Sequence, residues 1–336
     1  MKSSLLYSYQ VEYDDPYRTF ADSLEQIAVA EDLGYETVLV SEHHLVANGY
    51  FPAPFVTMAA IAMKTERMRV GSGVLLLPLY DPLHVAEHGT VLDHISRGRF
   101  TLGIGYGYRQ EEFDAFGVSL DDRPSRMREG IEAIRALWTQ PEANYQGEHF
   151  RYDNVTLRPL PLQKPHPPIW MASKAPGAVA ASARLAEAWF ADPVTPLAVL
   201  KDRLGVYQKA LAKQGKPTEG YEFPVMREVY CAETDDQAWE QARDGVLGAY
   251  KEYLDWGHLL DDEGNPVPPG DDRALDMLRS RFIIGSPQTC LRDALRYRDE
   301  LDCTEMVTRM KFPGVPAEGV MRSIRLWGER VMPELG

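Results

Sequence analysis

Short apolar runs alternate along the chain with longer segments in which apolar residues recur every three or four positions. This alternation is typical of βαβ units and predicts a parallel sheet. The predicted strands are Ser4–Tyr9, Thr37–Ser41, Arg69–Leu76, Arg99–Ile104, Pro168–Ala172, Ala188–Asp192, Pro224–Ala232 and Thr304–Met310. The helices predicted between and after them are Thr19–Leu33, Ala53–Lys64, Pro82–Ile95, Pro124–Trp138, Pro176–Leu185, Pro196–Ala212, Asp235–Leu254 and Pro316–Met332.

Eight strand–helix pairs in 336 residues predict an α/β fold, a (β/α)8 TIM barrel in a single domain over residues 1–336. A doubly wound open sheet is the alternative. Two stretches fall outside the alternation, about residues 140–167 and 255–284. We interpret both as insertions and expect the second, which follows strand 7, to form a lid with a short helix at Arg273–Phe282; a disordered loop is the alternative.

The net charge of −14, without any run of five or six basic residues, argues against a nucleic-acid or anionic-membrane surface. No stretch of about 18 apolar residues predicts a membrane span, and the N-terminus lacks the apolar core of a signal peptide. We therefore expect a cytoplasmic protein. Its three cysteines, Cys231, Cys290 and Cys303, match no zinc or redox spacing and are expected to be buried thiols.

Two adjacent histidines, His43 and His44, stand at the carboxyl end of the second predicted strand. Side chains of consecutive residues on an extended chain point to opposite faces, so the two cannot bind one metal ion without a sharp bend. His84 and His88 are four apart on a predicted outer helix and are not expected to be ligands, so no metal is predicted. For one of His43 and His44, a packed core residue and a general acid or base remain alternatives.

Glycines cluster near the ends of the third and fourth predicted strands. Gly71 and Gly73 within strand three indicate either a bulge or crowding inside the sheet, or the close approach of a flat ligand to Gly73-Val74. In strand four the spacing of Gly103, Gly105 and Gly107 is G-x-G-x-G, which does not match the dinucleotide fingerprint G-x-G-x-x-G. The glycines therefore do not favour a Rossmann site.

Candidate anion contacts follow the fourth and fifth strands. Arg109 supplies a fixed cation that an acidic protein would need for a phosphate. Ser173 and Lys174 precede a helix that begins near Pro176, where free amides also favour an anion; a solvated lysine is the alternative.

Two arginines, Arg227 and Arg309, lie inside strand-like runs. An arginine that faces the inside of a barrel needs a partner, such as Glu228, Asp192 or a ligand anion. Ion pairing within the core and contact with a ligand both remain open.

Several motifs together carry a resemblance that spans nearly the whole chain. They are "LGYETVLVSEHH", "TERMRVGSGVLLLPLYDPLHVAEHGTVLDHISRGRFTLGIGYGY", "EEFDAFGV", "EGIEAIRALWTQP", "PHPPIWMAS" and "GSPQTC". In this order and at these separations they resemble the bacterial luciferase-like flavin monooxygenase family. The resemblance implies a barrel that binds reduced FMN from a separate flavin reductase, traps O₂ as a flavin C4a-hydroperoxide and oxygenates a small organic substrate.

The resemblance also implies roles for individual residues. His43 matches the family's catalytic histidine, and Gly73-Val74 matches a non-proline cis peptide that presses on the flavin ring. Tyr106 and the Ser173–Lys174 loop match positions that contact the flavin chain and phosphate. Light-emitting members carry an arginine in place of Tyr106 and a glutamate in place of Ser173, so phosphate binding here is expected to pass to Arg109 and Lys174.

Four further residues are expected to contact the substrate or the lid: His44, Asn48, Arg227 and Arg309. The helices that contain "FVTMAAIAMK" and "HVAEHGTVLDHIS" resemble the family's dimer face, so a homodimer is expected. An F420-dependent oxidoreductase that transfers hydride is an alternative within the wider family, although no dense basic channel for an acidic cofactor tail is evident. A non-catalytic flavin-binding accessory protein is a third possibility.

Overall fold

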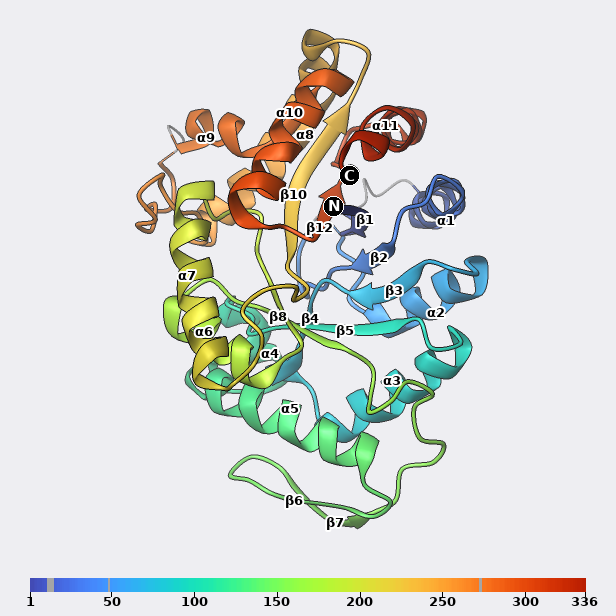
Figure 1. Ribbon diagram of the computed structural model, residues 1–336, viewed down its shortest axis with the longest axis vertical. Helices are drawn as coiled ribbons and strands as arrows, with labels where there is room; N and C mark the ends of the chain where they lie inside the picture. Colours follow the sequence, from blue (N-terminus) through green and yellow to red (C-terminus); the bar gives the residue numbers. More distant parts are fainter. Residues whose placement is uncertain (11–14, 48, 272–273) are drawn as a thin grey trace.

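The computed structural model describes residues 1–10, 15–47, 49–271 and 274–336 as an α/β fold around a curled parallel sheet (Figure 1). The strands are β1 (Lys2–Tyr7), β2 (Thr37–Val40), β3 (Arg69–Ser72), β4 (Leu75–Leu76), β5 (Phe100–Gly105), β6 (Ala143–Gln146), β7 (Arg151–Val155), β8 (Ile169–Ala172), β9 (Ala188–Phe190), β10 (Pro224–Cys231), β11 (Ile283–Gly285) and β12 (Glu305–Arg309).

Helices connect the strands and cover the outside of the sheet (Figure 1). They are α1 (Pro16–Asp32), α2 (Pro54–Lys64), α3 (Pro82–Ile95), α4 (Gln110–Phe116), α5 (Arg123–Thr139), α6 (Pro176–Leu185), α7 (Leu197–Lys213), α8 (Asp235–Asp255), α9 (Ala274–Met277), α10 (Pro287–Leu301) and α11 (Ala317–Arg330). Polar side chains fix several of the starts: Asp81 caps α3, Thr234 caps α8 and Ser286 caps α10.

The sheet runs in the order β11-β10-β12-β1-β2-β3-β5-β8-β9, with β4 paired to β5. Its two sides meet where Ala191, just after β9, bridges Val225 of β10, with a hydrogen bond from the amide of Met226 to the carbonyl of Ala191 at 3.0 Å. Every residue of β2, β5, β10 and β12 is buried, as expected for parallel strands that helices cover. The curled sheet therefore closes on itself at this bridge, and the carboxyl ends of its parallel strands lie on one side of the molecule.

Each predicted strand has a counterpart in the structure, displaced by at most a few residues. The third is interrupted between β3 and β4, where the Gly73-Val74 peptide bond is cis. Close packing explains another glycine nearby, because a Cβ on Gly103 would lie 1.9 Å from the backbone oxygen of Ser72. The glycines of β3 and β5 therefore reflect tight contact between neighbouring strands as well as proximity to the cavity described below.

Both insertions contain regular secondary structure. Residues 140–167 contain the hairpin of β6 and β7, which the sequence did not predict. After α8 the chain packs across the carboxyl ends of the strands, and the helix expected at Arg273–Phe282 is shorter, consisting of α9 and a 3-10 turn at Leu278–Arg281. Arg273 itself lies outside the described residues. β11, which pairs with the second half of β10, was also not predicted.

Two smaller expectations concern thiols and membranes. Cys231, Cys290 and Cys303 are buried and free, as expected. Among the described residues, none of the helices combines the length and the apolar character that crossing a bilayer would require.

Candidate active site

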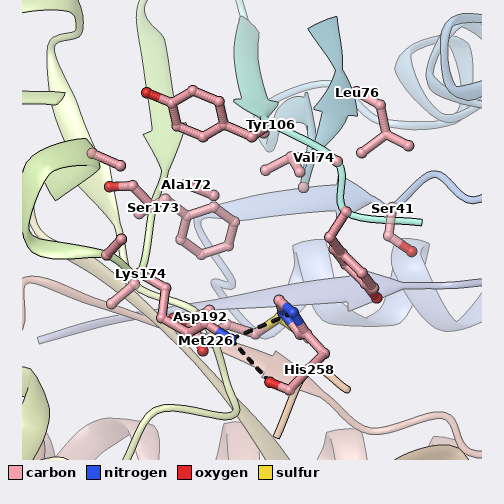
Figure 2. A pocket seen from close by; sticks show the side chains of 18 of the residues that line it. Ser41, Val74, Leu76, Tyr106, Ala172, Ser173, Lys174, Asp192, Met226 and His258 are labelled. Atoms are coloured by element: carbon pink, nitrogen blue, oxygen red, sulfur yellow. Dashed lines mark hydrogen bonds between the residues drawn. The ribbon is translucent and has the colours of Figure 1, made fainter. Parts of the chain in front are cut away.

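A cavity of about 740 Å³ opens at the carboxyl ends of the parallel strands (Figure 2). Its walls come from the residues that follow β2, β3, β5, β8 and β9, from the last residue of β12, from α5 and α6, and from the end of α8 and the chain after it. This volume lies within the range of sites for small molecules and cofactors. The carboxyl ends of the strands, from which the candidate residues were chosen, therefore do meet around one space.

His43 lies in the wall of this cavity and is 9% exposed. Its Nδ1 lies 2.9 Å from Oε1 of Glu112, and its Nε2 lies 3.3 Å from the hydroxyl of Tyr108. Because a carboxylate accepts a hydrogen bond, Nδ1 carries a hydrogen; whenever the ring is neutral, Nε2 is therefore an acceptor. The Tyr108 contact is long for a hydrogen bond from a hydroxyl, so another donor can replace it.

Glu112, on α4, is the partner that holds His43 in this orientation, and the sequence did not identify it. Its Oε1 accepts hydrogen bonds from His43, from the amide of His44 at 2.8 Å and from Arg109 at 3.3 Å. Burial acts to raise the pKa of Glu112, but these hydrogen bonds and the charge of Arg109 outweigh it and lower the pKa below its ordinary value. Glu112 is therefore a carboxylate at neutral pH.

His44 points away from the cavity. Its Nε2 lies 2.9 Å from Oε1 of Glu42, whose other oxygen accepts the amide of Leu76 at 2.6 Å. The Tyr80 hydroxyl also donates to Glu42. This network ties the end of β2 to β4, and it gives no geometric support to the expected contact of His44 with substrate.

The chain that follows α8 closes one end of the cavity. The ring of Trp256 lies 5.4 Å from that of His43, and the ring of His258 stacks on Tyr108 at 4.0 Å with 9° between the planes. Lys174, after β8, donates to the carbonyl of His258 at 2.9 Å (Figure 2). Burial lowers the pKa of His258 well below its ordinary value, and the charges of Lys174 and His43 lower it further. His258 is therefore neutral.

The other end of the cavity carries positive charge. Arg123 and Arg184 line it beside Tyr106, and their charges oppose the rise that burial causes in the pKa of Tyr106. Gly177 and Ala178 of α6 also line it, and no side chain caps this helix start. Free amides and two guanidinium groups together favour a phosphate. Figure 2 shows Tyr106 and His258 on opposite sides of the cavity.

Arg109, the expected phosphate ligand, does not line the cavity. Its guanidinium donates to the carbonyl of His44 at 2.6 Å and to Glu112, and it stacks over the ring of Trp256 at 4.7 Å. Ser173 lines the cavity, but its hydroxyl is shared with Ser182 at 2.9 Å. The cation for a phosphate is therefore better supplied by arginines that the sequence did not single out.

Arg227 and Arg309 have different surroundings. Arg227 is fully buried and donates to the carbonyls of Asp192, Met226 and Thr195 and to the hydroxyl of Tyr297, so it braces the sheet and does not reach the cavity. Arg309 lines the cavity and pairs with Glu228 at 2.6 Å. Asn48, the remaining candidate, lies outside the described residues.

Gly73 and Val74 also line the cavity. The peptide bond between them is cis, as the resemblance implies. The Val74 side chain and the neighbouring Leu6, Ala172 and Phe190 make this part of the wall apolar. A flat apolar ring is the kind of ligand that such a wall accommodates.

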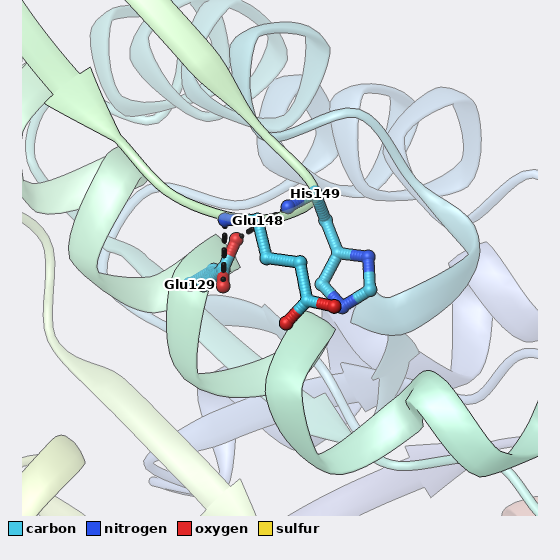
Figure 3. A group of neighbouring side chains, drawn as sticks. All are labelled: Glu129, Glu148 and His149. Carbon is cyan, nitrogen blue, oxygen red and sulfur yellow. Dashed lines mark hydrogen bonds between the residues drawn. The ribbon is translucent and has the colours of Figure 1, made fainter.

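A second group of side chains lies apart from the cavity: Glu129, Glu148 and His149 (Figure 3). Glu129 is 2% exposed, and its two oxygens accept the backbone amides of Glu148 at 3.1 Å and His149 at 2.9 Å. His149 also lies 2.8 Å from the hydroxyl of Ser125. These bonds explain the group as an anchor for the hairpin of β6 and β7.

A cavity of this size, with a buried histidine at one end and two arginines at the other, is typical of a site for a small molecule or cofactor. The family model for luciferase-like monooxygenases matches residues 1–302, so the chain belongs to that family. It is accordingly an oxidoreductase of the flavin-dependent monooxygenase class.

Several known proteins are similar to this chain. The 4-hydroxyprotoasukamycin monooxygenase of Streptomyces nodosus subsp. asukaensis is 28% identical over 84% of this chain and 78% of its own length. The oxygenase component of the flavin-dependent trigonelline monooxygenase of Acinetobacter baylyi is 29% identical over 65% of this chain and 61% of its own. The crystal structure of the monooxygenase RslO1 from Streptomyces bottropensis superposes with a TM-score of 0.89 at 26% identity, covering 100% of both chains.

Proposed function

We propose that this chain is the oxygenase of a two-component system that uses reduced FMN and O₂ to oxygenate a small organic substrate. In the overall reaction FMNH₂, O₂ and the substrate give FMN, water and a product that contains one more oxygen atom. The observation that carries the proposal is the placement of His43: a buried carboxylate fixes its Nδ1, and its Nε2 faces the cavity at the end away from Arg123 and Arg184.

The cavity fits FMN on three counts. Arg123, Arg184 and the start of α6 would hold the phosphate, with Tyr106 and Ser173 along the flavin chain. Gly73-Val74 would support one face of the ring. The volume of about 740 Å³ leaves room for a substrate beside the cofactor. When bound, the flavin supplies the electrons and the activated oxygen, and all other steps belong to the protein.

His43 serves as a proton acceptor or donor at Nε2, since Glu112 keeps Nδ1 protonated and stabilises the positive charge that the ring gains when Nε2 takes a proton. Residues 256–260 serve as a lid that excludes water from the ring end of the cavity, with Trp256 over His43 and His258 tied to Lys174. We also propose that the eight main strands form a (β/α)8 barrel. The insertion that comes after β10 and α8 would then supply this lid.

A separate flavin reductase is the proposed partner, since the similar trigonelline enzyme is named as an oxygenase component. We also propose a homodimer, because α2 and α3 leave large apolar side chains exposed: Val56 is 73%, Met63 76% and Val91 52% exposed. A monomer in sedimentation equilibrium at micromolar concentration would contradict the dimer and leave the enzymatic proposal intact.

An F420-dependent hydride transfer is the second candidate. The F420-dependent tetrahydromethanopterin reductase of Methanopyrus kandleri has a similar structure, with a TM-score of 0.79 at 16% identity, and this likeness shows a shared fold alone. A non-catalytic flavin-binding protein would not need the Glu112–His43 pair. The F420 candidate gains if the chain binds F420 more tightly than FMN.

The test is the variant His43→Ala. We expect a large fall in product formed per reduced flavin. FMN binding should stay close to that of the wild type, because His43 lies at the end of the cavity away from Arg123 and Arg184. His166→Ala, outside the cavity, is the matched control and should behave as the wild type. An unchanged product yield in His43→Ala would remove His43 from the mechanism.

A further inference from the structure

The end of the cavity beneath residues 256–260 is walled by aromatic rings. Around His43, the ring of Tyr50 lies at 5.0 Å and that of Tyr108 at 5.6 Å, both edge to face. Tyr108 in turn stacks on His258 at 4.0 Å, and Tyr253 lies 6.4 Å from His258. Four of these rings, those of Tyr50, Tyr108, Tyr253 and His258, line the cavity. We call these four residues the aromatic wall.

The aromatic wall offers uncharged hydroxyl groups. Burial raises the pKa values of Tyr50 and Tyr108 well above their ordinary range, so both are neutral phenols. The hydroxyls of Tyr50 and Tyr253 lie 3.4 Å apart, a separation too long for a strong bond. Tyr253 also accepts from Arg309 at 2.9 Å, which leaves its own hydroxyl hydrogen free to be donated.

The charged groups at this end are already held by hydrogen bonds within the protein. Arg309 is 1% exposed and pairs with Glu228 at 2.6 Å. Asp192 accepts the amides of Val194 at 3.0 Å and Thr195 at 2.9 Å. Lys174 donates to the carbonyl of His258, and burial lowers its pKa. A charged substrate buried here would therefore have to displace one of these hydrogen bonds to reach a charge of opposite sign.

The two ends of the cavity thus differ in chemistry. Arg184 at the far end is exposed and forms no ion pair with any carboxylate in the described part of the chain, so it remains available to an anion. The aromatic wall presents ring faces, ring edges and hydroxyl donors. Edge-to-face and offset contacts with such rings favour a planar aromatic ligand over a flexible chain, which also loses conformational freedom on binding.

We infer that the substrate is an uncharged planar aromatic compound with a phenol hydroxyl, held by the aromatic wall so that this hydroxyl accepts from the hydroxyl of Tyr253 and donates to Nε2 of His43. This inference rests on the proposed function, because it assigns the arginine end to the cofactor. It also identifies the aromatic wall as the set of residues that determines substrate specificity.

Three probes of similar size separate the possible ligand classes: 2-naphthol, 2-naphthoate and decan-1-ol. Their affinities for the full chain loaded with oxidised FMN can be measured by calorimetry at neutral pH. We expect 2-naphthol to bind at least about tenfold more tightly than either of the others. Tighter binding of 2-naphthoate would reveal an available cation, and tighter binding of decan-1-ol would indicate an aliphatic substrate. Either result, or no measurable binding of 2-naphthol, would overturn the inference.

The variant Tyr253→Phe removes the hydroxyl that the inference directs at the substrate oxygen and keeps the ring; within the described residues this hydroxyl lies 3.4 Å from that of Tyr50 and accepts from Arg309 at 2.9 Å. We expect its affinity for 2-naphthol to fall about threefold or more, with its affinity for naphthalene unchanged. Tyr207→Phe, on α7 and outside the cavity, is the matched control. Loss of affinity for both probes in equal measure would argue against a polar role of the wall.

These binding measurements need neither reduced flavin nor oxygen. If FMNH₂ bound to the protein reacts with O₂ as free flavin does, the proposed function fails whatever the probes show. If that reaction is altered by the protein but 2-naphthol does not bind preferentially, the proposed function stands and the substrate class is wrong.

Discussion

Replacing Glu112 by glutamine tests whether a carboxylate is required to position His43. The side chain of Glu112 is fully buried, and its Oε1 accepts all three hydrogen bonds described above. Its Oε2 has no hydrogen-bond partner among the described residues. A glutamine can therefore place its carbonyl oxygen at Oε1 and its amide nitrogen at Oε2 without a clash between donors. The substitution removes the charge and conserves the shape.

The magnitude follows from the change in bond type. A hydrogen bond to a charged group contributes about 1.5–3 kcal/mol, and one between neutral groups about 0.5–1.5 kcal/mol. The Glu112→Gln variant should therefore lose about 1–2 kcal/mol of stabilisation when His43 becomes positively charged. This corresponds to a fall of roughly 5-fold to 30-fold in the rate of coupled oxygenation. Substrate and FMN affinities should change little, because Glu112 touches neither.

The assay is single-turnover product formation with protein that carries FMNH₂, together with equilibrium FMN binding. Glu111→Gln, which removes the same charge from the exposed neighbouring position of α4, is the matched control and should retain the wild-type rate. The reasoning is refuted if Glu112→Gln reacts within about twofold of the wild type, or if its only effect is weaker FMN binding.

Three other substitutions probe the lid, the ring site and the phosphate site. The fold lowers the pKa of His258, so the unfolded chain takes up a proton at a higher pH than the folded protein does. The free energy of unfolding should therefore fall by up to ~1.4 kcal/mol per pH unit as the pH drops below the ordinary histidine pKa of 6.5. His258→Gln should remove this pH dependence in urea unfolding, and the same pH dependence in the variant and the wild type would contradict the reasoning. A Cβ on Gly105 would lie 2.5 Å from Cγ2 of Val74, so Gly105→Ala should weaken FMN binding by about 1–3 kcal/mol, whereas Gly205→Ala, with open space around its Cβ, should not. Arg184→Met should weaken binding of FMN but not of riboflavin, and an equal loss for both would exclude Arg184 as a phosphate contact.

Periodicity was sufficient to predict the main strands and helices. Each strand of the curled sheet is a short buried run between longer amphipathic segments, and this pattern is legible in a single sequence. The hairpin of β6 and β7 was not predicted because its strands are largely polar, with Glu129 and not a buried apolar face holding the turn between them. β11 has only 3 residues and lies inside an insertion.

The site was predicted only in part, because several of its contacts join residues that are distant in the sequence. His43 stands at a strand end, which sequence position alone can indicate, but its partner Glu112 is 69 residues away on a helix of 7 residues. Arg109 was expected to bind phosphate as a fixed cation. The sequence did not indicate that its guanidinium stacks over Trp256, because Trp256 approaches it only through the packing of the second insertion. Arg184 lies in the last turn of α6, and its place in the cavity wall is visible only in the folded arrangement.

The most direct test of the central claim is a stopped-flow spectrum of the protein loaded anaerobically with FMNH₂ and mixed with O₂, with F420 binding measured in parallel. The account predicts an absorbing species distinct from both reduced and oxidised FMN that outlives the reaction of free FMNH₂ under the same conditions. Direct conversion to oxidised FMN at the rate of the free flavin, together with tight binding of F420, would contradict it and move the assignment to hydride transfer.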